Sequence, residues 1–309
     1  NNRAVIEFLV HTGESREVRD LKPEDFANVR QIWENRVGVF ALNRNILAVR
    51  RLFNWAVESV VIKTPPAYGK QFKLAGRSVV RAHRAVVKEE RGDRKFTDDE
   101  LRAIINHEEC TGVLRTCIML ALNCGMYAVD CGELKWKDIR KVEGVTCIDR
   151  QRFKTNVKQR APLWPPIVER LEAIRPPSAK PDDIVFRQPN GSPVFVRASD
   201  HDWLSKQFSH VYGLACTKRQ GIGFGALKHT HTSAVGDHHD RVARFAVRAH
   251  LLADEDVEGT YDIPSVSRLQ AVTMLAYERL WLRYQTAPAE SVTPPPKVSS
   301  RTRRSSRQA

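Results

Sequence analysis

The sequence predicts a mainly α-helical protein with a small antiparallel β-sheet, divided into two domains. Its 309 residues are about twice the length of a typical single domain. Apolar residues recur at helical spacing along most of the chain, whereas "VEGVTCIDRQRFKTNVKQRAPLW" consists of short β-rich runs separated by polar turns. We therefore expect helical regions on both sides of a hairpin or a three-stranded sheet.

Residues 1–76 predict a small helical domain. "VIEFLVHTG" ends at a glycine, and "KPEDFANVRQIWENR" begins with a proline and acidic residues, which favour the first turn of a helix. The prolines of "KTPPAYGK" end a third helix, because proline lacks a backbone donor. Apolar residues at helical spacing are expected to line one face of that third helix: Ile46, Val49, Leu52, Phe53, Ala56 and Val57.

Residues 77–95 predict an exposed basic connector. The segment holds seven Lys and Arg residues against three acidic ones. Such a run is either a solvated surface or a segment that lies along a phosphate backbone, and the sequence leaves both open. In the second case the candidate DNA-binding residues are Arg81, Arg84 and Lys88.

Residues 96–285 predict a second, larger domain. It opens at "FTDDELRAIINH", where Thr97 and Glu100 form the pattern of a capping box before an apolar run. The β-rich stretch follows, and the chain is then mostly helical to "AVTMLAYERLWLRYQ". Residues 286–309 are rich in Pro, Ser and Arg with few apolar residues, which predicts a disordered basic tail.

Charge restricts the class of partner. Fifty Lys and Arg residues against 36 Asp and Glu give a formal net charge of +14, which favours a polyanion such as nucleic acid. The alternative is that the excess charge only aids solubility. No run of about 18 apolar residues is present, so we expect no contact with a membrane.

Cysteine usage predicts reduced thiols in the cytoplasm, or at the nucleoid if the protein is bacterial. Six cysteines in a chain with an ample core fit this better than a disulfide framework. No C-x-x-C pair indicates a zinc site. Four of the cysteines recur at every seventh residue and are expected to be buried on one helical face: Cys110, Cys117, Cys124 and Cys131.

Four segments of the second domain, in order, resemble the tyrosine recombinases, the phage integrase family. "LNCGMYAVDCGELKWKDI" is similar to the family's T-G-x-R-x-x-E-x-x-x-L-x-W-x-D-I, and "RFKTNVKQRAPLWP" is similar to its β-hairpin and following strand. "GALKHTHTSAV" resembles H-x-L-R-H-T-F-A, and "AHLLADEDVEGTY" resembles the G-H and Tyr ending. The resemblance implies a helical core-binding domain followed by an α+β tyrosine-recombinase-like catalytic domain.

The resemblance also implies a reaction and its residues. Tyr261 is the expected nucleophile, which attacks a DNA phosphodiester to give a 3′-phosphotyrosine without metal, ATP or another cofactor. Lys154 is the hairpin lysine, and His250 matches the histidine of the G-H motif. Lys228 stands at a phosphate-clamping position, with His229 beside it at the edge of the phosphate pocket.

Several positions depart from the family pattern. Tyr127 stands where the first clamping arginine belongs, and Gly225 where the first histidine belongs. Lys228 replaces the second arginine and Asp130 replaces a supporting glutamate. Lysine keeps the charge of arginine but loses its planar pair of donors. Other cations from the hairpin or a neighbouring helix are expected to enter the site if the chain is active, namely Arg152, Arg160, Arg241 or Arg244.

These departures leave the function open between classes. The chain is either a DNA strand transferase of the integrase kind, acting in integration or recombination of a mobile element, or a catalytically degenerate DNA-binding protein that retains the recombinase clamp. The expected partner is double-stranded DNA, including contacts from Arg152 and Arg160, with a homotetramer on DNA implied by the resemblance. A third hypothesis is a metal-dependent nuclease that uses the histidine cluster.

The histidines do not have the spacing of a metal site. Ligands on a helix are expected at positions i and i+4 with a third ligand, and H-x-H followed by H-H lacks this pattern. We therefore predict no bound metal. His231 is expected to face away from the pocket edge at His229, and His238 and His239 to lie at a helix end or turn.

Overall fold

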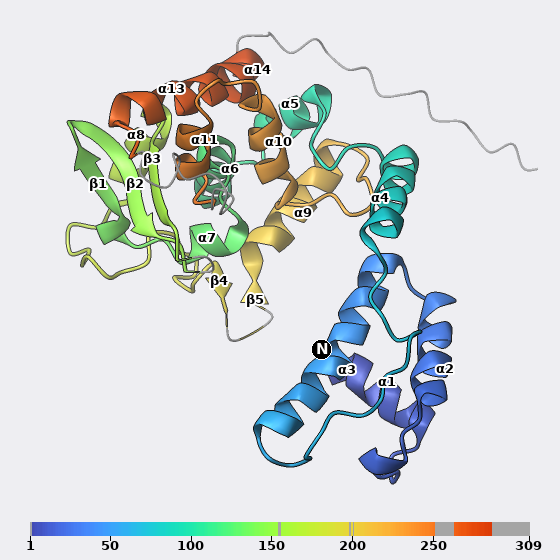
Figure 1. Ribbon diagram of the computed structural model, residues 1–309. Coiled ribbons are helices and arrows are strands. Elements are labelled where there is room, and N and C mark those ends of the chain that lie inside the picture. Colours follow the sequence, from blue (N-terminus) through green and yellow to red (C-terminus); the bar gives the residue numbers. More distant parts are fainter. Residues whose placement is uncertain (1, 154–155, 198, 200, 251–262, 286–309) are drawn as a thin grey trace, which may run out of the picture. The chain divides into compact units, whose positions relative to one another are not determined.

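The computed structural model divides the chain into two units, Asn1–Gly92 and Asp93–Ala309. It describes residues 2–153, 156–197, 199, 201–250 and 263–285 (Figure 1). The predicted connector lies largely in the first unit, where its residues form a helix that contacts the preceding one. Each unit has its own hydrophobic core.

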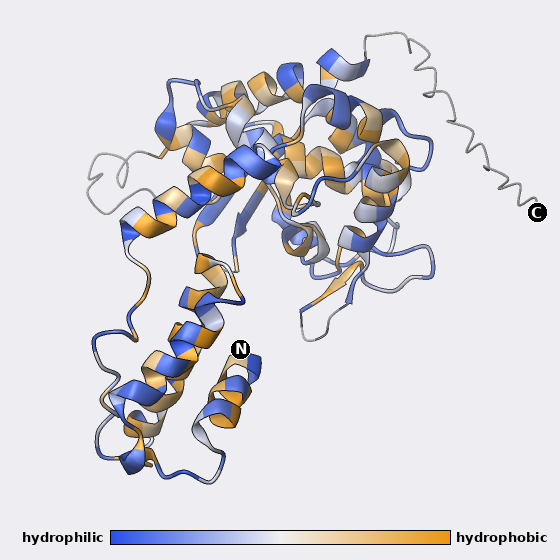
Figure 2. Cartoon of the chain, turned by 90° about the vertical axis from the view of Figure 1, so that its right-hand side faces the viewer, coloured by the Kyte–Doolittle hydropathy of each residue, from blue (hydrophilic) through white to orange (hydrophobic). Residues whose placement is uncertain are grey.

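The first unit is helical. Its elements are α1 (Asn2–Thr12), η1 (Val18–Asp20), α2 (Pro23–Glu34), α3 (Val39–Glu58) and α4 (Arg77–Arg91). Phe8, Phe26, Trp33 and Phe53 are buried between α1, α2 and α3, together with Ile46 on the predicted apolar face of α3. Helix α4 buries none of its residues, and the hydropathy colours show polar and apolar residues following one another along these helices (Figure 2).

The second unit is built mainly from helices around a small sheet. Its helices are α5 (Asp98–Asn106), α6 (Gly112–Cys124), α7 (Ala128–Gly132), η2 (Trp136–Asp138), α8 (Pro165–Ile174), α9 (Trp203–Ala215), α10 (Ala226–Ala234), α11 (Arg241–Val247), α13 (Val266–Tyr277), the π-helix η3 (Glu278–Leu282) and α14 (Arg283–Gln285). Its strands are β1 (Ile139–Val142), β2 (Val145–Gln151), β3 (Lys158–Pro162), β4 (Phe195–Val196) and β5 (His201–Asp202).

The predicted three-stranded antiparallel sheet is confirmed, with the order β1-β2-β3. The short pair β4-β5 is a difference from the sequence-based expectation of helix in this region. Its two strands have two residues each, too short for a period-two pattern to be visible in the sequence. The capping box at Thr97 is present, because its hydroxyl accepts from the Glu100 backbone and the Glu100 carboxylate accepts from the Thr97 backbone.

The core of the second unit is formed around α6, which has ten buried residues. Helix α6 contacts α8, α9, α10 and α13, so it brings parts of the chain that are distant in sequence together. The four regularly spaced cysteines are all buried, as predicted, but they do not share one helix. Cys110 precedes α6 and Cys131 lies on α7, because Gly125 ends α6 in the left-handed conformation.

Candidate phosphate-binding site

The candidate site is assembled around the end of α6. Gly125 has φ +69°, and an added Cβ atom there would lie 3.3 Å from Arg248 Cγ, 3.4 Å from His231 Cδ2 and 3.5 Å from Lys228 Cγ. Glycine is therefore required both for the backbone conformation and for the close approach of these side chains. The contact brings α10 and the residue after α11 onto the turn between α6 and α7.

Asp130 is the buried carboxylate of the site. It accepts two hydrogen bonds from Arg152, at 3.0 Å from Nε and 2.8 Å from Nη2, and one at 3.3 Å from Arg150 Nη2. It also caps α7 by accepting from the Tyr127 backbone at 2.9 Å. Burial raises the pKa of this carboxyl, but the hydrogen bonds from Arg152 and Tyr127 outweigh burial and hold the pKa below its ordinary value.

The ring of Tyr127 lies under two cations. The Arg152 guanidinium carbon is 5.5 Å from the ring centroid and Lys228 Nζ is 4.6 Å from it, both within the range of cation–π attraction. The ring also fills the space next to Gly225, where an added Cβ would meet it at 3.6 Å. Tyr127 therefore places one cation from the sheet and one from α10 around a single aromatic side chain.

Lys228 is buried and has no hydrogen-bond partner for its Nζ within the described part of the chain. Only 4% of the residue is exposed. Burial, followed by repulsion from Arg152, lowers the pKa of Lys228 to about 8. An unpaired buried ammonium group is costly, so this position favours an anion, which the described residues do not supply to Lys228 Nζ.

Arg248 and His250 complete the cluster. Arg248 is buried, and burial with repulsion from Arg244 lowers its pKa to about 10. Burial, with repulsion from Lys228, Arg248 and Arg152, lowers the pKa of His250 to about 4, so its imidazole is neutral at neutral pH. Ala249 adopts φ +49° between them, at the position where the family motif has glycine.

The excess of positive charge is the distinguishing property of this cluster. Among the described residues, the cations of this cluster are the buried Arg152, Lys228 and Arg248 and the half-buried Arg150, whose side chain is 7% exposed. Asp130 is the carboxylate that pairs with two of them. The uncompensated charge in a desolvated site favours a dianionic or polyanionic ligand such as phosphate.

The histidines of α10 are arranged differently from the expectation. His231, expected to face away, is buried beside Lys228, because residues three apart share a helical face. Its Nδ1 is 2.8 Å from the Leu122 carbonyl, and burial lowers its pKa to about 3. His229 is exposed, and burial of part of its ring with repulsion from Arg94 lowers its pKa.

His238 and His239 lie in the turn after α10, as expected, with their rings stacked at 4.7 Å. Among the described residues, no three His, Cys, Asp or Glu side chains form a group that could hold a metal ion. The histidine-rich segment therefore contributes one buried ring to the packing behind the cluster and exposes others.

The two candidate arginines of the hairpin point to opposite faces of the sheet. Arg160 lies opposite Asp149 on the neighbouring strand and pairs with it at 3.4 Å. Gln159 faces the other way, and its amide donates to the Val247 carbonyl at 2.9 Å. Side chains alternate along a strand, so Arg152 lies on the Gln159 face with Arg150, and Arg160 does not join the cluster.

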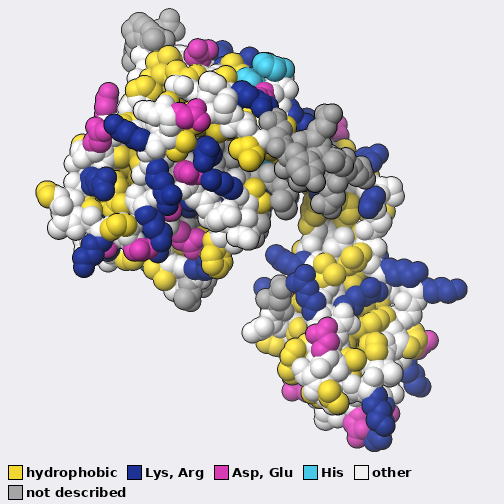
Figure 3. Space-filling view, turned by 60° about the vertical axis from the view of Figure 1, so that its left-hand side comes forward, with side chains coloured by type: hydrophobic (Ala, Val, Ile, Leu, Met, Phe, Trp, Pro, Cys, Tyr) yellow, Lys and Arg dark blue, Asp and Glu magenta, His cyan; other side chains and the backbone are white. Residues whose placement is uncertain are grey.

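The other predicted residues belong to the first unit or lie outside the described residues. Arg81, Arg84 and Lys88 are exposed on α4, where the Arg84 guanidinium lies 5.4 Å from the Phe40 ring centroid. Tyr261 and Lys154 lie outside the described residues. On the face shown in Figure 3, Lys and Arg side chains are spread over both units, with acidic side chains between them.

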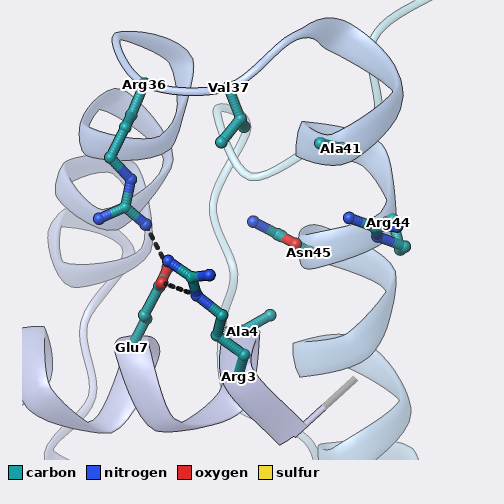
Figure 4. Close-up of a pocket in the computed structure, with 8 residues that line it drawn as sticks. All are labelled: Arg3, Ala4, Glu7, Arg36, Val37, Ala41, Arg44 and Asn45. Carbon is teal, nitrogen blue, oxygen red and sulfur yellow. Dashed lines mark hydrogen bonds and ion pairs between the residues drawn. The ribbon is translucent and has the colours of Figure 1, made fainter. Parts of the chain in front are cut away.

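A second group of arginines lines a pocket of about 450 Å³ in the first unit. Arg3 and Arg36 both pair with Glu7, at 3.0 Å and 2.5 Å, while Arg44 and Asn45 line the wall formed by α3 (Figure 4). Arg3 and Arg36 are exposed to solvent, in contrast to the cations around Asp130.

Arg248 and His231 were missed as members of the cluster by sequence reasoning. Arg248 immediately precedes the segment that resembles the G-H motif, and Lys228 and His231 have the i, i+3 spacing of one helical face. The positions of Arg248 and His231 in the sequence become informative only when the structure shows that both side chains lie next to Gly125.

Comparisons with known proteins relate the second unit to a known protein family. Residues 94–232 match the phage integrase family. No curated protein sequence matches the chain. Among the described helices, none is long and apolar enough to span a membrane.

Solved structures share the fold at low sequence identity. Lambda integrase residues 75–356, a dimer bound to a COC′ core site, match with a TM-score of 0.56 and 15% identity, covering 86% of this chain and 93% of that one. The XerH site-specific recombinase in its post-cleavage complex with palindromic difH substrate matches with a TM-score of 0.58 and 14% identity over 90% and 76% of the two chains.

The Tn1549 transposon integrase, in complex with circular intermediate DNA, matches with a TM-score of 0.55 and 14% identity over 87% and 90%. These likenesses agree in fold with the mainly helical architecture and small antiparallel sheet described above. The match over residues 94–232 places this segment of the second unit in the phage integrase family, the tyrosine recombinases, and the solved structures agree with it in fold.

Proposed function

We propose that this protein recombines specific DNA sites by tyrosine transesterification, with Tyr261 as the nucleophile. The observation that carries the proposal is a cluster of buried cations, in which Arg152 and Lys228 lie at the Tyr127 ring and Arg248 lies next to Gly125. The match of residues 94–232 to the phage integrase family supports site-specific recombination as the general activity. The cluster supports a site where the DNA phosphate is held.

The proposed reaction conserves the energy of the phosphodiester bond. The Tyr261 oxygen forms a bond to phosphorus while the bond from phosphorus to the 5′-oxygen breaks, and the leaving oxygen takes up a proton as a 5′-hydroxyl. The resulting 3′-phosphotyrosine is attacked by the 5′-hydroxyl of another strand, which releases the tyrosine. No oxidant, nucleotide or external energy source enters this balance.

The role of the cluster follows from the charge of the transition state. Negative charge grows on the nonbridging oxygens as the phosphate becomes pentavalent. Cations held in a desolvated site stabilise that charge more strongly than solvated cations, and they require no rearrangement when it develops. Lys228 is proposed to act on these oxygens, with neutral His250 as a hydrogen-bonding or proton-transfer group.

Lys154 and His229 are proposed in supporting roles. The family resemblance makes Lys154 the proton donor to the leaving 5′-oxygen. The exposure of His229 next to buried Lys228 supports a position at the rim of the site, where it would contact DNA on either side of the reacting phosphate.

Double-stranded DNA is the proposed substrate, bound by both units. The net charge of +14 supports an electrostatic attraction to the phosphate backbone, and Arg81, Arg84, Lys88 and Arg160 are proposed contacts. Lambda integrase has been solved as a tetramer bound to a Holliday junction. We propose the same order of assembly for this protein when two sites are brought together.

The direct test is covalent trapping on a nicked DNA duplex. The chain is incubated in EDTA with nicked fragments from a genomic pool, and products are separated on a denaturing gel beside Tyr261→Phe. We expect a protein–DNA band that the Phe variant lacks while binding DNA equally. A band of equal strength in both proteins would contradict the role of Tyr261.

A catalytically degenerate DNA-binding protein is the second candidate. Tyr127 favours it, because this position carries an arginine in the family motif and a tyrosine ring supplies no charge to a phosphate. This reading predicts salt-dependent DNA binding and no covalent band from either protein on DNA known to contain its site. The trapping assay therefore separates the two candidates.

A further inference from the structure

Arg152 places a guanidinium next to Tyr127, the residue that stands where the family motif has its first clamping arginine. It comes from the residue after β2 and not from α7, yet its guanidinium lies 5.5 Å from the Tyr127 ring centroid. It also holds Asp130, the residue that replaces the family's supporting glutamate, through two hydrogen bonds. A charge missing at position 127 is therefore present beside it, supplied from elsewhere in the chain.

We propose that Arg152 is a catalytic residue whose guanidinium binds a nonbridging oxygen of the scissile phosphate, in place of the arginine that Tyr127 removes. This inference rests on the proposed function. It names Arg152 as the second phosphate-binding cation, beside Lys228. Arg152 and Lys228 then act together across the Tyr127 ring, with one planar and one tetrahedral cation.

The hydrogen bonds of Arg152 leave a donor for the substrate. Nε and Nη2 are bound to Asp130, whereas Nη1 has no partner among the described residues. The bidentate contact fixes the plane of the guanidinium, so the remaining amino group has a defined direction. An oriented donor loses little entropy when a phosphate oxygen binds.

Arg150, two residues earlier on the same sheet face, does not have this property. Its Nε donates to Gln159 Oε1 at 3.2 Å, its Nη1 to the Asp130 carbonyl at 3.2 Å and its Nη2 to the Asp130 carboxylate at 3.3 Å. All three nitrogens are therefore engaged within the protein. Arg150 secures Asp130, and Arg152 is the arginine with capacity for a ligand.

The electrostatic environment supports an anion at this place. Arg152 and Lys228 both lie at the Tyr127 ring, and repulsion from Arg152 adds to burial in lowering the pKa values of Lys228 and His250. Two buried cations facing one another repel unless an anion lies between them. A phosphate oxygen shared by Arg152 and Lys228 would remove that repulsion.

The test compares rates of covalent trapping by full-length variants. Arg152→Ala removes the donor, Arg152→Lys retains charge without the planar fork, and Arg140→Ala is the matched control. Arg140 lies exposed on β1 of the same sheet, and its one hydrogen bond among the described residues goes to the Lys137 carbonyl, so its loss removes equal charge outside the cluster. Arg150 still pairs with Asp130 in every variant.

Arg152→Ala is expected to slow single-turnover trapping by about 10²–10³, the usual effect of losing one transition-state donor, while DNA affinity changes little. Arg152→Lys should recover only part of this rate, and Arg140→Ala should match the parent. Adding Tyr127→Arg to Arg152→Ala returns a guanidinium to the site and should raise the rate about tenfold or more. A double variant that folds and binds DNA but stays as slow as Arg152→Ala would contradict direct contact with phosphate.

A second measurement separates this inference from the proposed function. Calorimetric titration with tungstate, a phosphate-sized dianion, reports the anion site whether or not the chain cleaves DNA. Arg152→Ala and Lys228→Ala should each weaken tungstate binding about tenfold or more, with Arg140→Ala unchanged. If the parent traps no DNA but Arg152→Ala loses tungstate, only the activity fails. If Arg152→Ala traps DNA and binds tungstate like the parent, the role of Arg152 is overturned.

Discussion

The two arginine-rich regions of this protein differ in solvation and in compensation of charge. In the pocket of the first unit, Arg3 and Arg36 share Glu7 and remain open to solvent, with side-chain exposures of 88% and 49%. In the second unit, Arg152 is 5% exposed and Lys228 is 4% exposed, and Lys228 Nζ has no partner among the described residues. The second region holds buried charge that the first does not.

The difference shows why a count of basic residues does not identify a phosphate site. Exposed ion pairs are screened by water and contribute little on their own. A buried cation without a counter-charge costs free energy in the absence of ligand and repays it when an anion binds. The cluster around Tyr127 has the second property, and the pocket around Glu7 has the first.

The largest expected difference between the regions is in stability. Asp130→Asn leaves Arg150 and Arg152 without a buried counter-charge, which is expected to lower the free energy of local unfolding by about 3–5 kcal/mol. Glu7→Gln breaks exposed pairs and should lower it by about 0–1 kcal/mol. Amide hydrogen exchange read by mass spectrometry measures both, because peptides from α7 and α1 report the two units separately.

Equal losses of local unfolding free energy in Asp130→Asn and Glu7→Gln would contradict the difference between the two regions. They would mean that solvent reaches Asp130 as freely as Glu7, and that the burial of the cluster does not persist in solution. A loss confined to Asp130→Asn would support the difference. Both variants replace a carboxylate by an amide, so unequal losses would reflect the surroundings of the carboxylate.

A smaller effect is expected in the pH dependence of trapping. Lys228 has a pKa of about 8, so its charge is present below that pH and is lost as the pH rises through it. Arg248 and His250 have pKa values of about 10 and about 4, so neither changes charge near pH 8. The second-order trapping rate of the parent should therefore fall above about pH 8, because this rate reports the free enzyme.

Lys228→Arg is the matched variant for this prediction. Arginine keeps its charge throughout this range, so the fall above about pH 8 should disappear. The same lysine has a stability consequence of the opposite sign: burial of its charge costs free energy below about pH 8, and that cost diminishes between about pH 8 and the ordinary lysine value of 10.5. An unchanged pH profile in Lys228→Arg would exclude Lys228 as the titrating group.

Features that depend on neighbouring residues were predicted from the sequence. The capping box at Thr97 and the three-stranded sheet are short-range patterns, and the structure contains both. The family resemblance was visible because each motif occupies a contiguous segment, and it agrees with the family match over residues 94–232. The pair β4-β5 was not predicted, since strands of two residues carry no periodicity.

The composition of the cluster required the tertiary structure. Arg152 and Arg160 were both candidates, and only their register relative to Asp149 and Gln159 shows which face of the sheet each occupies. Likewise, His231 is buried and does not face away as expected, because the buried face of α10 is set by its packing on α6. Sequence gives the residues of a helix or strand, and packing decides which of them meet.

The most direct measurement of the central claim is the position of a phosphate-sized anion in crystals soaked with tungstate. An anomalous difference map locates tungsten without reference to catalysis. The cluster predicts a peak within hydrogen-bonding distance of Arg152 and Lys228, near the Tyr127 ring, and an empty pocket at Glu7. A peak among Arg3, Arg36 and Arg44 with none beside Tyr127 would contradict the claim that uncompensated buried charge makes the phosphate site.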